Sequence, residues 1–306
     1  MADKATIHYI ARKDINTTLW DQCIHHSANG LIYATHEYLD TICVDWDGLV
    51  MDDYDMVMPL VWRRKLGIHY LYYPPFCASL GVFGNHLTPF TIGEFLSAIP
   101  PKFRYWDFPL NFGNLINLEK FPCTIRSNYI LDLGGGYAAI SANYRENLRR
   151  NIRKSAALQF SVSIDFPVWE VVALARLYTP KAVFAPEIYT RFEKIYTILA
   201  SRGKAKTYGI RNEKGALLAS AVFLFDEKRA YYMLVGNHPD GKTAGASHAM
   251  LDAFIKDHAG QQLILDFEGS DIRNLAYFYS GFGASVENYP VIQLNRLPAA
   301  VSWLKK

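Results

Sequence analysis

The chain has 306 residues, of which 50% are hydrophobic and 14% aromatic, so it has enough apolar material for two ordinary domains or one large one. This composition excludes a largely disordered protein. The net charge of +3 is too small to indicate nucleic-acid binding by itself, and we expect no DNA partner.

Targeting and metal-binding patterns are missing from the sequence. No apolar run reaches the ~18 residues of a membrane-spanning helix, and the N-terminal MADKATIHYIARKD lacks the apolar region of a secretory signal. We therefore expect a cytoplasmic protein that does not span a membrane. The cysteines form no CxxC, which favours reduced, buried thiols, and the histidines show no metal-ligand spacing, so we predict no metal site.

The first half begins with a strand, IHYIAR, followed by helical patterns in NTTLWDQCIHH and THEYLDTIC. Three strands follow, WDGLVMDD, DMVMPLVWRR and IHYLYYPP, because they are rich in β-branched and aromatic residues and are separated by short turns. A helix over TIGEFLSAI and strands over FRYWDFPLN and NYILDLG complete this half.

The second half repeats this plan. Two amphipathic helices, PVWEVVALARLY and EIYTRFEKIYTILASRG, precede the strands AKTYGIR, ALLASAVFLFD and AYYMLVGN. HPDGKTAG is a loop by composition, ASHAMLDAFIKDHAG is a helix, and a strand (LILDFEG), a helix (SDIRNLAYFYSG) and a final strand (VENYPVIQLNR) follow. The shared order predicts two domains of the same fold, residues 1–140 and 141–306.

A basic segment, YRENLRRNIRKSAA, lies where the halves join. On a helix, Arg149 and Arg153 form one row, and Arg150 and Lys154 form an adjacent row. A solvated face beside a domain boundary is the more common explanation of such a surface. The alternative is that Arg149, Arg150 and Arg153 clamp a phosphate, because guanidinium groups match phosphate oxygens in pairs.

The element order of the second half resembles the GNAT acyltransferase fold, in which acyl-CoA lies between the splayed fourth and fifth strands. The resemblance implies that backbone N–H groups of the next loop and a helix N-terminus hold the pyrophosphate. The GNAT loop has a Gln or Arg, two residues, a Gly, one residue, and then a Gly or Ala. The matching residues here are Lys242, Gly245, Ala246 and Ser247, so Lys replaces the Gln or Arg and Ser replaces the last small residue. Together with Val235 on the preceding strand, they are the donor-binding residues that the resemblance implies.

Two such halves in tandem resemble the Fem family of peptidoglycan aminoacyl transferases and the wider FemAB-like GNAT proteins. The segments YRENLRRNIRKSAA, LDFEGS and FYSGFGA carry this resemblance. It implies an α+β fold of two GNAT-like domains, each a mixed, mostly antiparallel sheet flanked by helices. Fem enzymes use aminoacyl-tRNA and other members use acyl-CoA, so we expect one of these as a co-substrate and no tightly bound cofactor. The implied acceptor is a small molecule or a cell-wall precursor with an amine or hydroxyl group.

The two copies differ where a phosphate would bind. The first copy reads PPFCASLGVFGN there, with Pro74 and Pro75 where N–H donors are needed. We therefore expect the second domain to bind the donor and the first to contact the acceptor through Tyr72, Tyr73 and Phe76. The alternative is that these aromatic side chains belong to the core.

The strand LILDFEG carries the candidate general base. Alternation along a strand places Asp266 and Glu268 on one face. Attack on a thioester or ester requires a neutral amine, so a carboxylate beside the opening can accept its proton, and two acids about 7 Å apart raise each other's pKa. In the alternative interpretation, Asp266 binds backbone N–H groups and Glu268 pairs with Arg273.

The next helix carries the candidate general acid. Its helical spacing predicts a buried stripe formed by Ile272, Leu275, Ala276 and Tyr279. Tyr277 lies off that stripe, four residues before Gly281-Phe282, where many GNAT enzymes have the tyrosine that protonates the departing sulfur. The resemblance implies Tyr277 as general acid, with a surface tyrosine as the alternative.

Two functions stay open at this point. The first is an acyl or aminoacyl transferase that acts on an amine or hydroxyl acceptor. The second is a non-catalytic binding module that keeps the GNAT fold and has lost the chemistry. The GxSxG, HExxH and Walker A patterns of other enzyme classes do not occur in the sequence.

Overall fold

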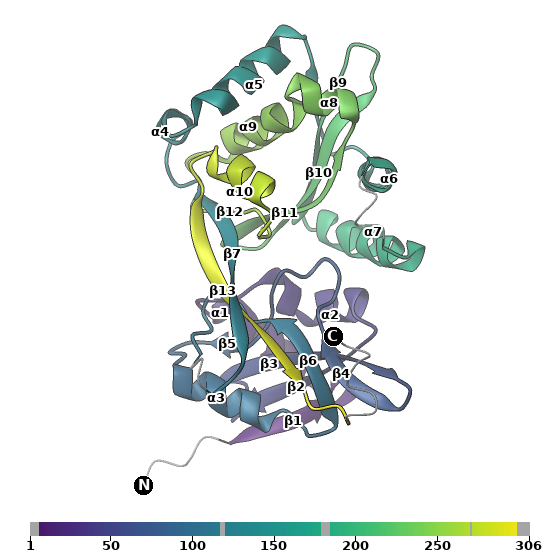
Figure 1. Cartoon of the computed structure of the whole chain (residues 1–306), viewed down its shortest axis with the longest axis vertical. Coiled ribbons are helices and arrows are strands. Elements are labelled where there is room, and N and C mark those ends of the chain that lie inside the picture. The colour runs from purple at the N-terminus through teal and green to yellow at the C-terminus, as the bar shows by residue number, and fades with distance from the viewer. Residues whose placement is uncertain (1–5, 117–119, 179–183, 270, 299–306) are drawn as a thin grey trace. The chain divides into compact units, whose positions relative to one another are not determined.

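The computed structural model describes residues 6–116, 120–178, 184–269 and 271–298. Contacts divide the chain into two compact units: one runs up to Arg126 and resumes at Asn288, and the other runs from Ser127 to Glu287. Figure 1 traces the elements of both units. No helix in the described ranges is long and apolar enough to cross a bilayer.

The first unit is a sheet with helices on both faces. Its strands are β1 (Ile7–Ala11), β2 (Asp45–Met51), β3 (Met56–Lys65), β4 (Ile68–Tyr72), β5 (Phe83–Gly84), β6 (Phe103–Pro109) and the C-terminal part of β13 (Ser285–Asn295). Its helices are α1 (Thr17–His26), α2 (His36–Ile42) and α3 (Pro89–Ala98), with short 3-10 turns at Arg12–Asp14 and Ile32–Ala34. Along β2, the ring of Trp46 packs on that of Trp20 of α1, with ring centroids 5.1 Å apart. Leu49 points to the opposite face of the strand and lies in the cluster that contains Phe95 of α3.

The second unit is a sheet between two layers of helices. The chain enters it within β7 (Cys123–Asp132), and its further strands are β8 (Ser161–Ile164), β9 (Ala205–Arg211), β10 (Leu217–Phe225), β11 (Arg229–Asn237) and β12 (Ile264–Asp266). Its helices are α4 (Tyr137–Ala142), α5 (Glu146–Ala157), α6 (Val168–Tyr178), α7 (Pro186–Ala200), α8 (Pro239–Ala244), α9 (Ala246–His258) and α10 (Arg273–Ser280). As Figure 1 shows, α9 covers one face with α5 packed against it, and α6 and α7 cover the other face.

The two units repeat one strand order. In the first, β1-β2-β3-β4 form an antiparallel series, β4 pairs in parallel with β6, and β6 pairs antiparallel with β13. In the second, β8-β9-β10-β11 form the antiparallel series, β11 pairs in parallel with β12, and β12 pairs antiparallel with β7. The repeat predicted from the sequence is therefore present in the strand pairing.

The units do not divide at residue 140, the boundary that the sequence predicted. In each unit, the strand beyond the parallel pair comes from outside the half that supplies its other strands. Val291–Asn295 pairs with Tyr105–Pro109 in the first unit, and Ile130–Asp132 pairs with Ile264–Asp266 in the second. Because these partners lie far apart in the sequence, element order alone does not show which unit the two strands join.

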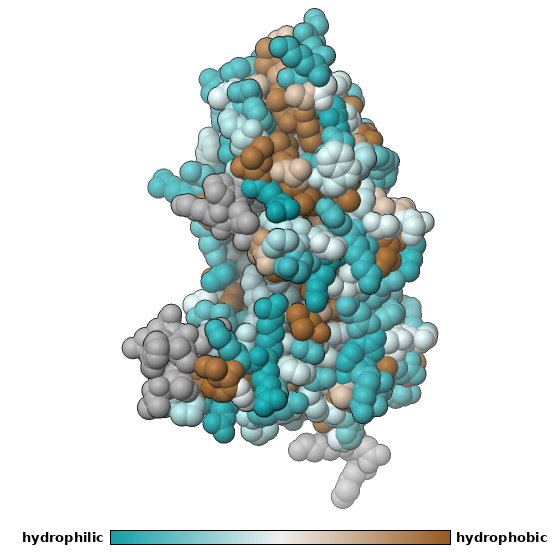
Figure 2. All heavy atoms as spheres, turned by 90° about the vertical axis from the view of Figure 1, so that its right-hand side faces the viewer, coloured by the Kyte–Doolittle hydropathy of each residue, from teal (hydrophilic) through white to brown (hydrophobic). Residues whose placement is uncertain are grey.

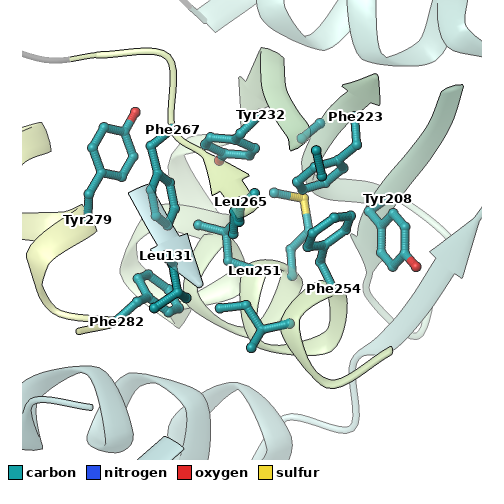
Figure 3. Close-up of a cluster of buried hydrophobic side chains, with 14 of the residues drawn as sticks. Leu131, Tyr208, Phe223, Tyr232, Leu251, Phe254, Leu265, Phe267, Tyr279 and Phe282 are labelled. Atoms are coloured by element: carbon teal, nitrogen blue, oxygen red, sulfur yellow. The ribbon is translucent and has the colours of Figure 1, made fainter. Parts of the chain in front are cut away.

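Aromatic side chains fill the core of the second unit (Figure 3). Phe223 of β10 stacks on Phe254 of α9 with ring centroids 3.7 Å apart, and Phe267 stacks on Tyr279 of α10 at 4.6 Å. Tyr232 of β11 meets both Phe267 and Tyr279 edge-on. These rings fasten α9 and α10 to the sheet next to β11 and β12.

Four elements of the second unit differ from the sequence prediction. The predicted loop HPDGKTAG contains α8, which the His238 side chain caps and the left-handed Gly245 ends. The short elements α4 and β8 were not predicted. The buried stripe of α10 is wrong in part: Tyr279 is buried as predicted, but Ile272, which precedes the helix, and Leu275, which lies in it, are 63% and 40% exposed. Ser270, at the start of the predicted helix, lies outside the described residues.

Hydrophobic residues are also exposed on the second unit, as the upper half of Figure 2 shows. Val162 and Ile164 of the outer strand β8 are 47% and 41% exposed. The cysteines are free thiols, of which Cys43 and Cys77 are buried, while the other two are partly exposed.

Candidate active site

The strands β11 and β12 separate after a short stretch of pairing. Arg229–Tyr231 pairs with Ile264–Asp266, whereas β11 continues to Asn237. The register between β10 and β11 shifts just before Val235, and an irregularity of this kind bends a strand. In the first unit, by contrast, β4 pairs with β6 up to its last residue, Tyr72. Within the described residues, the splay between parallel neighbours is therefore a feature of the second unit.

Glu268 lies in a left-handed turn at the end of β12. The strand ends at Asp266, and the φ angles of Glu268 and Gly269 are 65° and 79°. The alternation that predicted a shared face for Asp266 and Glu268 therefore does not reach Glu268. A non-glycine residue in this conformation costs about 1–2 kcal/mol, and backbone strain of this kind is typical of functional sites.

Asp266 is the centre of a buried ion-pair network. Its Oδ2 accepts a hydrogen bond from Arg229 Nη1 at 2.8 Å, and its Oδ1 accepts from Asn128 Nδ2 and from the Glu268 N–H, each at 2.9 Å. Arg229 also donates to both carboxylate oxygens of Glu287, at 2.8 and 2.9 Å. With its oxygens engaged in this way, Asp266 matches the alternative interpretation, in which it binds the backbone, better than the interpretation as a base.

The two tyrosines of α10 have different surroundings. Tyr277 is 56% exposed, and the Arg145 guanidinium lies 5.0 Å from its ring centroid. Tyr279 is 7% exposed, and burial, followed by the charge of Glu268, raises its pKa. Glu268 therefore acts on the pKa of the Tyr279 phenol, whereas Tyr277 is a surface residue.

The residues expected to bind the donor phosphate lie in α8 and in the first turn of α9. The N–H of Lys242 donates to His238 O and the N–H of Gly245 donates to Gly241 O, so both groups are already engaged in α8. The expected open loop at Lys242 and Gly245 is thus wrong. Gly245 itself is needed, because its φ is 76° and a Cβ atom there would lie 2.6 Å from Asn151 O of α5.

Ala246 and Ser247 begin α9, where the first N–H groups of a helix lack intrahelical acceptors. Ser247 Oγ donates to Asn237 Oδ1 at 2.6 Å, which fixes this turn against the end of β11. From α5, Lys154 Nζ donates to Thr243 O at 2.8 Å. The remaining candidate for phosphate binding is therefore the α9 N-terminus, with the exposed Lys242 and Lys154 beside it.

The arginines of α5 are exposed, and each has a partner within its own region. Arg149 Nη2 donates to Ala142 O at 2.7 Å, and Arg150 Nη2 donates to Asn147 Oδ1 at 3.4 Å. Arg153 pairs with Glu146 at 2.5 Å, with both side chains more than 60% exposed (69% and 65%). The helix itself is as predicted, and its role as a phosphate clamp stays a prediction.

The predicted acceptor contacts belong to the first unit. The Arg63 guanidinium lies 4.6 Å from the Tyr72 ring centroid, and burial raises the Tyr72 pKa. Arg63 Nε is buried and has no hydrogen-bond partner among the described residues. Tyr73 is 50% exposed, and Phe76 has a left-handed φ of 57°. Their contact with an acceptor stays a prediction.

Sequence reasoning missed His248, in the first turn of α9. Its ring meets Phe278 of α10 edge-on at 4.8 Å, and its Nδ1 is buried without a hydrogen-bond partner in the described part of the chain. Burial lowers the pKa of His248 to about 4, so the imidazole is neutral at pH 7. No periodicity singles out this residue, because its contact with Phe278 of α10 depends on the tertiary structure.

Comparison with known proteins agrees with this geometry. Residues 142–271 match the family model of the acetyltransferase (GNAT) domain. Residues 142–271 thus form a GNAT-type domain. The match covers β11, β12 and the helices between them, and it confirms the expectation of an acyltransferase. No curated protein matches the sequence.

The GNAT domain is part of a longer shared fold. A crystal structure of FemX superposes with a TM-score of 0.69 at 13% identity, covering 97% of this chain and 99% of that one. L-PGS from Bacillus licheniformis gives 0.58 at 13% identity, with 95% of each chain covered. A tandem GNAT protein from the clavulanic acid biosynthesis pathway gives 0.53 at 12% identity, covering 97% of this chain and 100% of that one. At these identities the similarity shows the fold alone, and it confirms an α+β, FemAB-like tandem GNAT fold.

Proposed function

We propose that the protein transfers an acyl or aminoacyl group from an activated donor to an amine or hydroxyl acceptor, with the reaction at the splay between β11 and β12. The observation that carries this proposal is the position of Glu268. It follows the strand that borders the splay, in a strained left-handed turn, and the equivalent strands of the first unit show no such opening.

Glu268 is the proposed general base. A protonated amine has no lone pair for attack, so the carboxylate accepts a proton as nitrogen bonds to the acyl carbon. The tetrahedral intermediate then collapses, the acyl–donor bond breaks, and the leaving thiol or hydroxyl takes up a proton. Tyr279 is the proposed hydrogen-bond donor to that leaving group, because its raised pKa keeps the phenol protonated. Tyr277 is the second candidate, and Asp266 supports the turn instead of taking protons.

The donor is acyl-CoA or aminoacyl-tRNA, and both carry phosphate. We propose that a donor phosphate lies at the first turn of α9, near Ala246 and Ser247, with Lys242 and Lys154 providing positive charge. The exposed arginines of α5 favour the larger donor, since a row of cations suits a nucleic-acid backbone. FemX also resembles this chain over nearly its whole length. The proposed acceptor is a small molecule or cell-wall precursor, with tRNA as a partner if the donor is aminoacyl-tRNA.

Two binding measurements separate the donors. A ligand at a hundredfold excess over its Kd stabilises the folded state by about 2.7 kcal/mol, so millimolar acetyl-CoA is expected to raise the Tm if acyl-CoA is the donor. A rise that Lys242→Glu removes supports this donor. Binding of aminoacyl-tRNA that weakens steeply with salt, without an acetyl-CoA shift, supports the other.

Turnover tests the chemistry. The assay follows release of CoA thiol from acetyl-CoA with hydroxylamine as a generic amine acceptor, or loss of the aminoacyl group from tRNA. Glu268→Gln is expected to lower kcat about 100-fold or more while donor binding is unchanged. Glu213→Gln, on an exposed turn of the same unit, is the matched control and is expected to keep full activity. Wild-type activity in Glu268→Gln would refute the assignment, and absence of turnover with both donors would favour the non-catalytic binding module.

A further inference from the structure

The Glu268 turn is held by a side chain from β7, a neighbouring strand that is far from Glu268 in the sequence. Asn128 of β7 is buried, and its Oδ1 accepts hydrogen bonds from the Gly269 N–H at 2.5 Å and the Tyr129 N–H at 2.8 Å. Its Nδ2 donates to Asp266 Oδ1 at 2.9 Å. The orientation of this amide is fixed, because a flip would face an NH₂ group toward two N–H donors and an oxygen toward a carboxylate.

Asp266 completes the support of the turn. The same Oδ1 that accepts from Asn128 also accepts the Glu268 N–H at 2.9 Å. Consecutive N–H groups, those of Glu268 and Gly269, are therefore bound by a carboxylate and an amide that bind each other. Both residues have positive φ, so this pair of hydrogen bonds stabilises a conformation that Glu268 rarely adopts by itself.

The support is rigid because it is anchored in the sheet. Arg229 holds the other oxygen of Asp266 at 2.8 Å and is itself 4% exposed. The direct pairing of β12 with β7, which aligns Asp266 with Ile130, sets the distance that Asn128 spans. An amide at this position on β7 thus reaches the turn without bending either strand.

We propose that Asn128 is a positioning residue that fixes the Glu268 carboxylate for proton transfer. This inference rests on the proposed function, in which Glu268 is the general base. Asn128 does not touch the reacting atoms and acts through the Gly269 N–H and through Asp266. Its loss frees the turn to leave the left-handed conformation, which moves the carboxylate away from the acceptor amine. A displacement of about 1 Å costs about 100-fold in rate.

A double-mutant cycle tests this role with acetyl-CoA, or with aminoacyl-tRNA if the wild type uses that donor, and hydroxylamine as acceptor. Asn128→Ala is expected to lower kcat 10- to 100-fold without changing the donor KM, and to have no further effect in Glu268→Gln. Asn128→Asp keeps the volume and the acceptor oxygen but loses donation to Asp266, so the same pattern is expected if Asn128→Ala does not fold. Asn114→Ala, in a buried amide network of the first unit, is the control for a stability loss alone.

The outcomes separate this inference from the proposed function. If Glu268→Gln keeps wild-type activity, the general base is elsewhere and both proposals fall. If Glu268→Gln loses activity but folded Asn128→Ala and Asn128→Asp keep theirs, Glu268 is the base and the positioning role is wrong. If Asn128→Ala lowers activity equally in the wild type and in Glu268→Gln, Asn128 acts independently of Glu268, which also refutes the inference.

Discussion

Replacing Arg229 with methionine is expected to destabilise the second unit strongly. The Arg229 side chain is 5% exposed, and its guanidinium neutralises Asp266 and Glu287, whose side chains are 6% and 16% exposed. The variant leaves two carboxylates facing each other with little solvent, and removing one member of a buried ion-pair network costs about 3–5 kcal/mol. For a unit of this size each kcal/mol lowers the Tm by about 2–4 °C, so the expected fall is about 6–20 °C.

Thermal unfolding followed by circular dichroism measures this loss. Arg211→Met is the matched control, because the Arg211–Glu170 pair is more exposed, at 22% for each side chain, and is expected to be worth about 1 kcal/mol or less. The triple variant Arg229→Met, Asp266→Asn, Glu287→Gln removes the unpaired charges and is expected to recover much of the loss. A triple variant no more stable than Arg229→Met would show that the loss comes from packing of the arginine stem.

Three further perturbations test other parts of the structure. The pKa of His248 is about 4 in the folded state and about 6.5 in the unfolded state, so the unfolded state binds more protons between these pH values. The free energy of unfolding of the wild type therefore falls as the pH drops from 6.5 to 4, and His248→Phe is expected to flatten this dependence in denaturation curves. Gly245→Ala is expected to cost more in urea unfolding than Gly260→Ala, because both have a positive φ but only Gly245 faces a backbone oxygen, that of Asn151. Asn114→Leu is expected to cost about 1–3 kcal/mol in the same assay, because it leaves the Val82 N–H, which donates to Asn114 Oδ1, without this acceptor.

The arrangement of strands and helices was largely predictable from the sequence. Runs of β-branched and aromatic residues identify β9, β10 and β11, and helical spacing identifies α5, α9 and the inward side of Tyr279. Their order resembles that of the tandem GNAT fold, which the structural comparisons confirm. These signals are local, so they survive without knowledge of the tertiary contacts.

The details of the site were not predictable in the same way. Asn128 and Asp266 are 138 residues apart, and nothing in NYILDLG marks its asparagine as a partner of LDFEG. The left-handed Glu268 breaks the strand alternation from which a shared face with Asp266 was inferred. At α8, a histidine cap, a proline at the first turn and a terminal glycine form a short helix, although the same residue types are typical of loops. Each of these features depends on which elements meet, which one-dimensional periodicity does not encode.

The strand pairing predicts which part of the chain can fold alone. Residues 127–287 contain residues 127–132 of β7 and every strand from β8 to β12, so the β7–β12 pairing and the pairings among β8 to β12 lie within one continuous segment. Residues 1–140, by contrast, lack β13, the antiparallel partner of β6, and keep β7 without β12. Unpaired strand edges are typical sites of aggregation.

We therefore expect residues 127–287 to be soluble when expressed alone and to unfold cooperatively in thermal melts, with the melting temperature lowered again by Arg229→Met. Residues 1–140 and 141–306 are expected to aggregate or to melt without a cooperative transition. The first fragment lacks β13, the antiparallel partner of β6, and the second lacks β7, the antiparallel partner of β12. Cooperative folding of both of these fragments, with residues 127–287 unfolded, would show that the strand contributed by the other half does not stabilise either unit. The same melts with acetyl-CoA then show whether residues 127–287, which carry Glu268 and the α9 N-terminus, bind the donor without the first unit.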